Sequence, residues 1–599
     1  MSADTIIARF MKQADQRPHA KGYYVKEGNA WKATTWKTYV DEVRTAARAL
    51  LSLGISRKHG TDDELSCVCI LGFNRPEWII MDLAAMAVGG APAGIYTTCS
   101  PTEVAYIVSH TEAKVVLVEN VDQWKKIEEE RENLPKLEHV ILMKGAGEVD
   151  DDMVLTWDDF IAKAEDTSDD TLQEYIDALS PDELATLIYT SGTTGPPKGV
   201  MLSHHNLSWT ATSAQDMITT GPEDCVVSYL PLSHIAEQMF SIHTPCTSGM
   251  QVYFAESLEK VKDNFAEVRP TVLFAVPRIW EKFYAGVSTK MAAATGLKAK
   301  LVGWARDTGR QVNDLRNNGQ EPSGLLAIKY NFFNDKVYSK LKTALGLDRT
   351  KICVSGAAPI SKEILEFFSS LDVVIREVYG QSEDCGPTSF NLPGRTKIGS
   401  VGPPIPGCDV KIADDDEILV KGPNVFMGYY KDEEATNEAL IDGWLHSGDL
   451  GKIDSQGFLH ITGRKKDLII TAGGKNIAPK NIESSLKDLN LIGEAVAIGD
   501  RRKYLTALIS LDPDESAAYA KEHDLDEAKL CESPQLRGVI QEHVDKVNAA
   551  LARVEQIKKF SITKRPFSIE DGELTPTLKV KRTKVHEHFA DDIEAMYGD

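Results

Sequence analysis

The stretch ATLIYTSGTTGPPKG, residues 185–199, joins a strand pattern to a loop rich in glycine and hydroxyl groups. Its first six residues are apolar, aromatic or β-branched, which predicts a buried strand over 185–190. In the loop, two glycines let the backbone approach a ligand, hydroxyl groups supply donors, and Lys198 adds a positive charge. It is not a Walker loop, because Gly199 rather than Ser or Thr follows Lys198. A plain surface turn is the alternative interpretation, but so many specified positions favour a polyphosphate-binding loop.

Short apolar segments alternate with helical patterns on both sides of this loop. A helix is expected to begin near residue 76, with Asn74 as its cap and Pro76 in its first turn. Strands separated by helices predict parallel α/β layers. Further buried strands are predicted at 67–71, 115–119, 139–143, 225–230, 271–276 and 351–355.

The sequence pattern changes near residue 400, where the Gly- and Pro-rich stretch VGPPIPG (401–407) precedes shorter predicted strands. Beyond GRKKD (463–467) the pattern becomes compact α+β. We therefore predict a large domain over 1–463, a boundary at 464–467 and a small domain over 468–599. Within the large domain, residues 285–346 hold ten basic and four acidic residues with helical spacing of apolar positions.

Composition excludes several classes of protein. The 599 residues carry a formal net charge of −22, which argues against general nucleic-acid binding. The nine cysteines form no CxxC pair or zinc-ligand cluster, which favours reduced thiols in a cytoplasmic compartment. No signal peptide is expected from MSADTIIARF. The most apolar stretch, 78–96, is interrupted by Asp82, Gly89, Gly90 and Pro92, so we expect a buried helix, turn and strand instead of a membrane span.

Motifs along most of the chain resemble the adenylate-forming superfamily of acyl-CoA synthetases, luciferases and peptide-synthetase adenylation domains. TSGTTGPPKG is similar to the phosphate-loop signature of that superfamily. Six further matches follow in the family's order: LPLSH (230–234), GAAP (356–359), YGQSE (379–383), GWLHSGD (443–449), GRKKDLI (463–469) and TPTLKVKR (575–582). The resemblance implies a large N-terminal domain of parallel sheets, helices and a distorted β-barrel, followed by a small mobile α+β domain.

The resemblance also implies a site for ATP. Asp449 would accept hydrogen bonds from the ribose, supported by Arg464. Tyr379 would stack on adenine opposite Gly356 and Ala357. The remaining nucleotide contacts implied by the motifs are Thr190, Ser191, Gly192, Thr193, Thr194, Gly195, Lys198, Gly380, Gln381 and Ser382. A lone Asp after Ser-Gly is usually a turn residue, and only the order of the motifs favours the nucleotide interpretation for Asp449.

The catalytic groups implied by the resemblance are Lys579, Glu383, His234 and Lys198. Lys579 would bridge the acyl oxygen and the α-phosphate, while Glu383 and Thr190 would hold Mg²⁺. His234 would lie between the nucleotide and acyl sites, with a packed or capping histidine as the alternative. Many relatives carry Ser-Gly before the lysine where this chain has Thr577-Leu578, so Lys581 remains an alternative to Lys579.

The implied reaction has two steps at the same carboxyl carbon, formation of the acyl-adenylate and transfer to coenzyme A, and each step requires different protein groups near that carbon. By resemblance, the small domain rotates about a hinge at Lys466, and Ala472, Gly473 and Gly474 then line a channel for coenzyme A.

Within the superfamily, the chain is most similar to long-chain fatty acyl-CoA synthetases of the bubblegum type. The motifs that carry this similarity are YLPLSHIAEQ (229–238), VPRIWEKF (276–283), VFMGYY (425–430) and LIITAGGKNIAP (468–479). The implied reaction joins a long-chain fatty acid to coenzyme A at the expense of ATP. The alternatives are an acyl-AMP ligase that loads a carrier protein and a non-catalytic nucleotide-binding protein. The basic segment 285–346 is either a purely structural pair of helices or a contact with anionic membranes.

Overall fold

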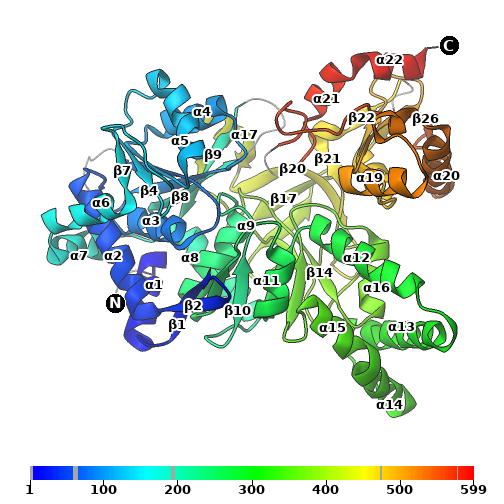
Figure 1. Ribbon diagram of the computed structural model, residues 1–599, viewed down its shortest axis with the longest axis horizontal. Coiled ribbons are helices and arrows are strands. Elements are labelled where there is room, and N and C mark those ends of the chain that lie inside the picture. Colours follow the sequence, from blue (N-terminus) through cyan, green and yellow to red (C-terminus); the bar gives the residue numbers. More distant parts are fainter. Residues whose placement is uncertain (1–3, 58–64, 191–195, 473–474, 576–577, 599) are drawn as a thin grey trace.

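The computed structural model describes residues 4–57, 65–190, 196–472, 475–575 and 578–598. Most of the chain forms a broad body of several sheets, and the last part of the chain forms a smaller unit beside it (Figure 1).

An eight-stranded sheet carries the quoted stretch 185–199. Its order is β18-β9-β8-β4-β3-β5-β6-β7. The strands from β8 to β7 are parallel, whereas β9 and β18 run antiparallel to their neighbours. Their bounds are β3 Cys67–Leu71, β4 Ala91–Ile95, β5 Val115–Val118, β6 His139–Leu142, β7 Val154–Thr156, β8 Leu184–Thr190, β9 Lys198–Ser203 and β18 Gly428–Tyr429.

Two four-stranded sheets form the middle of the body. One has the order β10-β11-β1-β2 and the other β12-β13-β14-β15. The six buried strands predicted at 67–71, 115–119, 139–143, 225–230, 271–276 and 351–355 are all present as β3, β5, β6, β10, β12 and β13. Each end of each strand lies within two residues of its predicted position. The bounds are β1 Lys21–Glu27, β2 Ala30–Thr35, β10 Cys225–Ser228, β11 Gln251–Phe254, β12 Val272–Ala275, β13 Ile352–Ser355, β14 Ile375–Tyr379 and β15 Ser389–Phe390.

The expected start of the helix near residue 76 is partly wrong. Helix α3 spans Pro76–Ala87, with Pro76 in its first turn as predicted, but Arg75 is its N-cap residue and makes no side-chain cap bond. Asn74 instead points its amide at Ser228 and at the Leu230 carbonyl, at 2.8 and 2.7 Å. These two bonds from the amide nitrogen orient the side chain away from the helix, and its oxygen accepts no bond from the first turn of α3.

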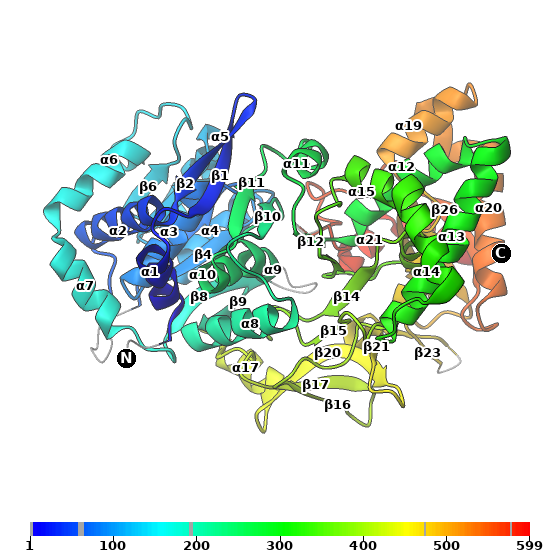
Figure 2. The ribbon, with the colours of Figure 1, turned by 90° about the horizontal axis from the view of Figure 1, so that it is seen from below.

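The basic segment is helical, as predicted, but comprises more than a pair of helices. Helices α12 Pro277–Ala292, α13 Gly296–Asn317, α14 Gly324–Phe333 and α15 Ser339–Leu345 are linked by short turns and a π-helical turn over Asn334–Tyr338. Helices α13 and α14 lie at the lower right edge of the molecule in Figure 1, and in Figure 2, seen from below, they lie in front of the last part of the chain. No helix in the described part of the chain has the length and apolar character that crossing a membrane requires.

A five-stranded antiparallel sheet occupies the region after residue 400. It contains β16 Asp409–Ile412, β17 Glu417–Lys421, β19 Leu440–Ile441, β20 Trp444–Ile453 and β21 Leu459–Arg464. Strand β21 ends at Arg464, and a 3₁₀ turn over Lys465–Asp467 leads into the C-terminal domain.

The C-terminal domain has its own core around a three-stranded sheet, β24-β25-β26. The strands span Ile492–Ile498, Leu505–Leu511 and Ile557–Ile562. Helices α18 Pro479–Leu486, α19 Pro513–Glu522, α20 Pro534–Ala549, α21 Arg582–His588 and α22 Ala590–Tyr597 complete it.

Candidate functional site

Asp449 is the centre of a buried polar cluster between β14 and β20. Tyr379 and Gln381 donate to its Oδ2 at 2.9 and 2.6 Å, and Arg464 donates to its Oδ1 at 2.8 Å. Strand β20 pairs antiparallel with β21, so that Asp449 faces Arg464 directly across the ladder. Only 4% of Asp449 is exposed. These four residues, which belong to three separate sequence motifs, therefore form one rigid constellation.

The backbone beside this cluster is compact. A Cβ on Gly380 would lie 1.3 Å from the Gly386 carbonyl oxygen, and one on Gly356 would lie 2.6 Å from Val378. Ala357 has φ of 65°, in the left-handed region. Ser382 is buried, and Asp384 closes the same turn by accepting from the Gln381 amide at 2.6 Å. The glycines thus admit a close approach of backbone segments that no larger residue would allow.

Glu383 and Lys198 meet around one tyrosine. The Tyr429 hydroxyl donates to Glu383 at 2.8 Å, and the Lys198 ammonium lies 4.9 Å from the centre of the Tyr429 ring. Lys198 also lies 3.5 Å from Asp432. Thr190 and Lys198 are direct partners in the β8–β9 pairing, so the two ends of the loop are adjacent. The loop residues Ser191, Gly192, Thr193, Thr194 and Gly195 lie outside the described residues.

An apolar cleft with a cavity volume of about 100 Å³, partly open to solvent, adjoins this polar cluster in the large domain. His234, Ala357, Gly380 and Gln381 are among the residues that line it. The rest of the lining is mostly apolar side chains from α8 (His204–Met217), β12, β14 and the π-helical turn Met239–His243, for example Met217, Met239, Phe240, Val272, Phe274 and Val378. A cleft with this lining fits a hydrocarbon chain whose polar end is near Gln381.

His234 both caps a helix and lines the cleft. Its Nδ1 accepts from the Ala236 amide at 3.1 Å, at the start of α9 (Ile235–Gln238). Burial, and then the nearby positive charge of Lys579, lower the pKa of His234 to about 4. The imidazole is therefore neutral at physiological pH.

Lys579 comes from the C-terminal domain and reaches the same region. Lys579 keeps solvent-accessible surface, although many protein atoms surround its side chain. The resulting loss of hydration, followed by repulsion from Arg464 and Lys480, lowers the pKa of Lys579 to about 8, while Asp449 and Glu383 oppose the shift. Lys579 is thus close enough to both carboxylates and to His234 to interact with all three.

Lys581 has a different environment from Lys579. It lies 3.6 Å from Glu103, in the first turn of α4 (Pro101–Thr111) in the large domain. A second ion pair between the domains joins Arg278 on α12 to Asp512 at the start of α19. Both pairs hold the C-terminal domain in the arrangement that brings Lys579, and not Lys581, to the polar cluster.

The remaining predicted residues lie outside that cluster. Lys466 is exposed in the 3₁₀ turn between the domains, and Ala472 is exposed with its amide bonded to the Arg502 carbonyl at 2.9 Å. Gly473 and Gly474 lie outside the described residues.

Sequence reasoning missed two members of the site, Lys480 and Tyr429. Helix α18 packs against β21, and Ala478 contacts the backbone at Gly463, which brings Lys480 beside Arg464. VFMGYY (425–430) marked Tyr429 only as part of a resemblance, because its contact with Glu383 joins residues 46 positions apart.

Comparison with known proteins identifies a family for both parts of the chain. The AMP-binding enzyme family matches residues 10–430, and the C-terminal domain of AMP-binding enzymes matches residues 466–599. The chain belongs to the AMP-binding enzyme family. The chain is 39% identical to the long-chain-fatty-acid–CoA ligase ACSBG2 of Xenopus laevis over 96% of its own length and 81% of that protein. It is 35% identical to the ligase ACSBG1 of Rattus norvegicus, over 99% and 85% of the two chains.

Solved structures of AMP-binding enzymes share the fold at lower identity. The adenylation domain of a carboxylate reductase from Mycobacterium chelonae has a TM-score of 0.74 at 21% identity, over 99% of this chain and 91% of that one. The anthranilate CoA ligase AuaEII in complex with anthranoyl-AMP has a TM-score of 0.70 at 19% identity, over 98% and 97%. The predicted fold class, a large domain of sheets and helices with a small C-terminal domain, is confirmed.

Proposed function

We propose that this chain is a long-chain fatty acid–CoA ligase. It converts a fatty acid and ATP to an acyl-adenylate and pyrophosphate, and then transfers the acyl group to coenzyme A with release of AMP. The observation that carries this proposal is the apolar cleft whose lining includes Gln381, which donates to Asp449, and His234, which lies near the Lys579 ammonium. The long-chain specificity of the curated relatives supports the same substrate class.

The first half-reaction brings together two anions. A carboxylate and a phosphate charge 4 Å apart repel by about 4 kcal/mol at an effective dielectric constant near 20. We infer that Lys579 offsets this repulsion by contacting the acyl oxygen and the α-phosphate together, and that Lys198 contacts the outer phosphates. The neutral His234 separates the acyl cleft from the nucleotide without adding charge.

The residues present fit a magnesium ion that is shared with the nucleotide. Magnesium in such sites takes one or two protein oxygens and completes its shell with substrate phosphates and water. Glu383 supplies a carboxylate and Thr190 a hydroxyl on neighbouring elements, and no cluster of three His, Cys, Asp or Glu side chains is found in the described residues. When bound there, the ion would neutralise charge on the phosphates that leave.

The nucleotide would be fixed by the large domain. We infer that Asp449, which keeps unused lone pairs beside its three donors, accepts from the ribose hydroxyls. Tyr379, with Gly356 and Ala357 opposite, would enclose adenine. In the second half-reaction, rotation about Lys466 would withdraw Lys579 and bring the segment from Ala472 to Gly474 to the channel for coenzyme A.

Exposed apolar and basic side chains on α13 and α14 support the predicted membrane contact. Five large apolar residues are between 50% and 77% exposed on α13 and α14: Leu297, Trp304, Leu325, Ile328 and Phe332. No ion pair is found in the described residues for the neighbouring lysines 298, 300, 329, 336 and 340. Arg316 and Lys342, in contrast, pair with Asp372. We propose that this outer face, and not the whole basic segment, rests on anionic lipid, in which the fatty acid dissolves.

Flotation with liposomes tests this contact. Lys298→Glu with Lys300→Glu should weaken binding to phosphatidylserine vesicles about tenfold or more, since each lysine near such a surface contributes about 1 kcal/mol. The matched control carries Lys521→Glu with Lys529→Glu, two exposed lysines on the C-terminal domain. Equal flotation of both variants, or of neutral and anionic vesicles, would contradict the proposal.

The reaction itself is tested with purified protein, ATP, Mg²⁺ and fatty acids from C8 to C24, with acetate and coumarate as controls. We expect pyrophosphate and an acyl-CoA product with long-chain acids only. An acyl-adenylate that forms but fails to react with coenzyme A would favour a carrier-protein ligase. Absence of both AMP and pyrophosphate would overturn the proposed function.

A further inference from the structure

Lys579 is carried at the tip of a short hairpin in the C-terminal domain. The Lys581 amide donates to the Glu573 carbonyl at 2.7 Å, and the Thr575 amide donates to the Lys579 carbonyl at 2.7 Å. Leu574 and Val580 form an antiparallel bridge between these bonds. The position of the Lys579 backbone therefore depends directly on how the hairpin stem is held.

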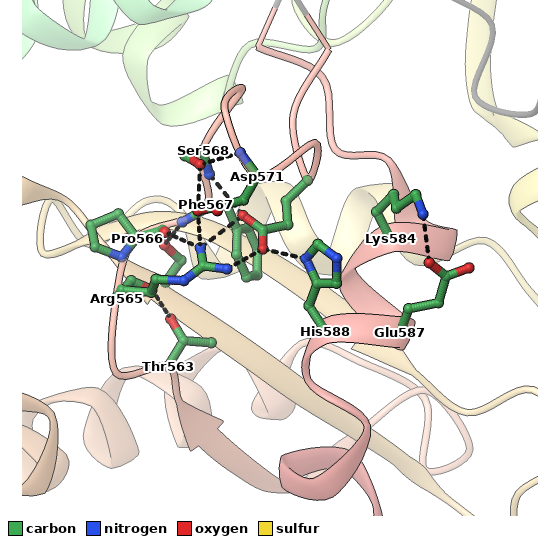
Figure 3. A network of polar contacts seen from close by, with 11 residues as sticks. Thr563, Arg565, Pro566, Phe567, Ser568, Asp571, Lys584, Glu587 and His588 are labelled. Carbon is green, nitrogen blue, oxygen red and sulfur yellow. Dashed lines mark hydrogen bonds and ion pairs between the residues drawn. The ribbon is translucent and has the colours of Figure 1, made fainter. Parts of the chain in front are cut away.

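The stem is held by the carboxylate of Glu573, which is completely buried. Arg565 donates to its two oxygens, at 2.5 Å to Oε1 and 2.9 Å to Oε2. His588 contacts Oε1 at 2.7 Å, and the Ser568 amide donates to Oε2 at 3.0 Å. Figure 3 shows Arg565 and His588 on opposite sides of one carboxylate, from the segment before the hairpin and from α21 after it. One side chain thus ties three segments together at the base of the hairpin.

The electrostatics favour a charged anchor. Burial by itself raises the pKa of Glu573, but the bonds from Arg565, His588 and the Ser568 amide together lower it to about 2. The carboxylate therefore stays ionised throughout the working pH range. Arg565 is fixed in turn, with its guanidinium 5.4 Å from the centre of the Phe589 ring. Arg565 is 43% exposed and also pairs with Asp571 at 3.0 Å, so loss of the Glu573 charge would free the base of the hairpin without leaving a buried cation unpaired.

The surroundings of this anchor belong to the C-terminal domain. Leu574 packs with Phe567, Val585 and Phe589 in a small core that also includes side chains of β24 and β25, and the larger core of the domain is a separate cluster. In the described residues, no hydrogen bond or ion pair joins Glu573 to the large domain, and none of its bonding partners belongs to the predicted nucleotide or acyl sites. The most direct route from Glu573 to the reaction therefore runs through the hairpin to Lys579.

We propose that Glu573, clamped between Arg565 and His588, is a positioning residue that fixes the Lys579 hairpin for acyl-adenylate formation and has no part in transfer to coenzyme A. The inference rests on the proposed function, in which Lys579 acts only in the first half-reaction. Displacement of a catalytic group by about 1 Å lowers a rate about a hundredfold, and a lysine on a loosened hairpin is displaced by that order.

The test is the variant Glu573→Gln in the full-length protein, assayed on each half-reaction separately. Formation of oleoyl-AMP should slow about tenfold to a hundredfold, while transfer from supplied oleoyl-AMP to coenzyme A should stay within about twofold. Transfer serves as the folding control, because it needs the same C-terminal domain intact. The matched control is Glu587→Gln, which breaks the exposed Lys584–Glu587 pair drawn in Figure 3 and should leave both rates unchanged.

A double variant separates positioning from general stabilisation. In a Lys579→Ala background, Glu573→Gln should cause no further loss of oleoyl-AMP formation, since the group it positions is absent. Unchanged oleoyl-AMP formation in the single variant would overturn the inference, as would equal losses in both half-reactions or an additive loss in the double variant. The wild-type protein separates failure of this inference from failure of the proposed function. If the wild-type protein forms no oleoyl-AMP, the proposed function itself fails.

Discussion

The two polar regions that meet at the site are built in opposite ways. Asp449 in the large domain is buried and accepts three side-chain hydrogen bonds, from Tyr379, Gln381 and Arg464. Lys579 in the small domain is accessible, and its ammonium has no hydrogen-bond or ion-pair partner in the described residues. The difference corresponds to the proposed roles, because a group that serves both half-reactions profits from rigidity, while one that must leave profits from having few bonds to break.

The largest expected effect comes from removing the Lys579 ammonium of the small domain. Lys579→Ala should slow acyl-adenylate formation a hundredfold or more, which corresponds to about 2.7 kcal/mol of transition-state stabilisation. Transfer from supplied acyl-adenylate to coenzyme A should be unaffected. Pyrophosphate release and a single-turnover transfer assay measure the two steps.

Lys581→Ala is the control for this variant. It removes a half-buried pair with Glu103, at 3.6 Å, and pairs that retain contact with solvent contribute between 0 and about 1 kcal/mol. Adenylate formation should therefore fall by less than about fivefold. A larger loss with Lys581→Ala than with Lys579→Ala would exchange the roles of the two lysines.

A smaller effect concerns pH. The pKa of Lys579 is lowered to about 8 from the ordinary lysine value, and only its protonated form stabilises the phosphate charge. As pH rises through 8, kcat/KM for adenylate formation should therefore fall, approaching tenfold per pH unit. Lys480→Met removes one of the cations that lower this pKa, so the falling limb should move to higher pH.

Lys475→Met is the matched control for the pH profile. Lys475 is an exposed lysine on the same domain and is not among the groups that shift the pKa of Lys579. Its profile should match that of the wild-type protein. If the fall of kcat/KM occurs at the same pH in Lys480→Met as in the wild-type protein, repulsion between Lys480 and Lys579 does not set the pKa of Lys579.

The sequence predicted those features whose causes are local. Buried strands and the helical segment 285–346 follow from apolar patterning, which is why their bounds agree with the structure within a few residues. Asn74 was misassigned because its amide is satisfied by Ser228 and Leu230, more than 150 residues away. Lys480 was missed for the same reason, since nothing near it in sequence indicates that α18 packs beside Arg464.

The smallest expected effect concerns the backbone of the Lys579 hairpin. Leu578 has φ of 59°, where an L-residue costs about 1–2 kcal/mol, and its side chain is 56% exposed. Leu578→Gly removes this strain and loses about 0.5–1 kcal/mol to the greater freedom of glycine in the unfolded chain. The net result should be a stabilisation of about 0.5 kcal/mol, measured by thermal unfolding, with adenylate formation unchanged within about twofold. Leu578→Ala keeps the strain and should give no gain. If the alanine variant were the more stable, the hairpin would not require the left-handed conformation, and its geometry would depend on the Glu573 anchor alone.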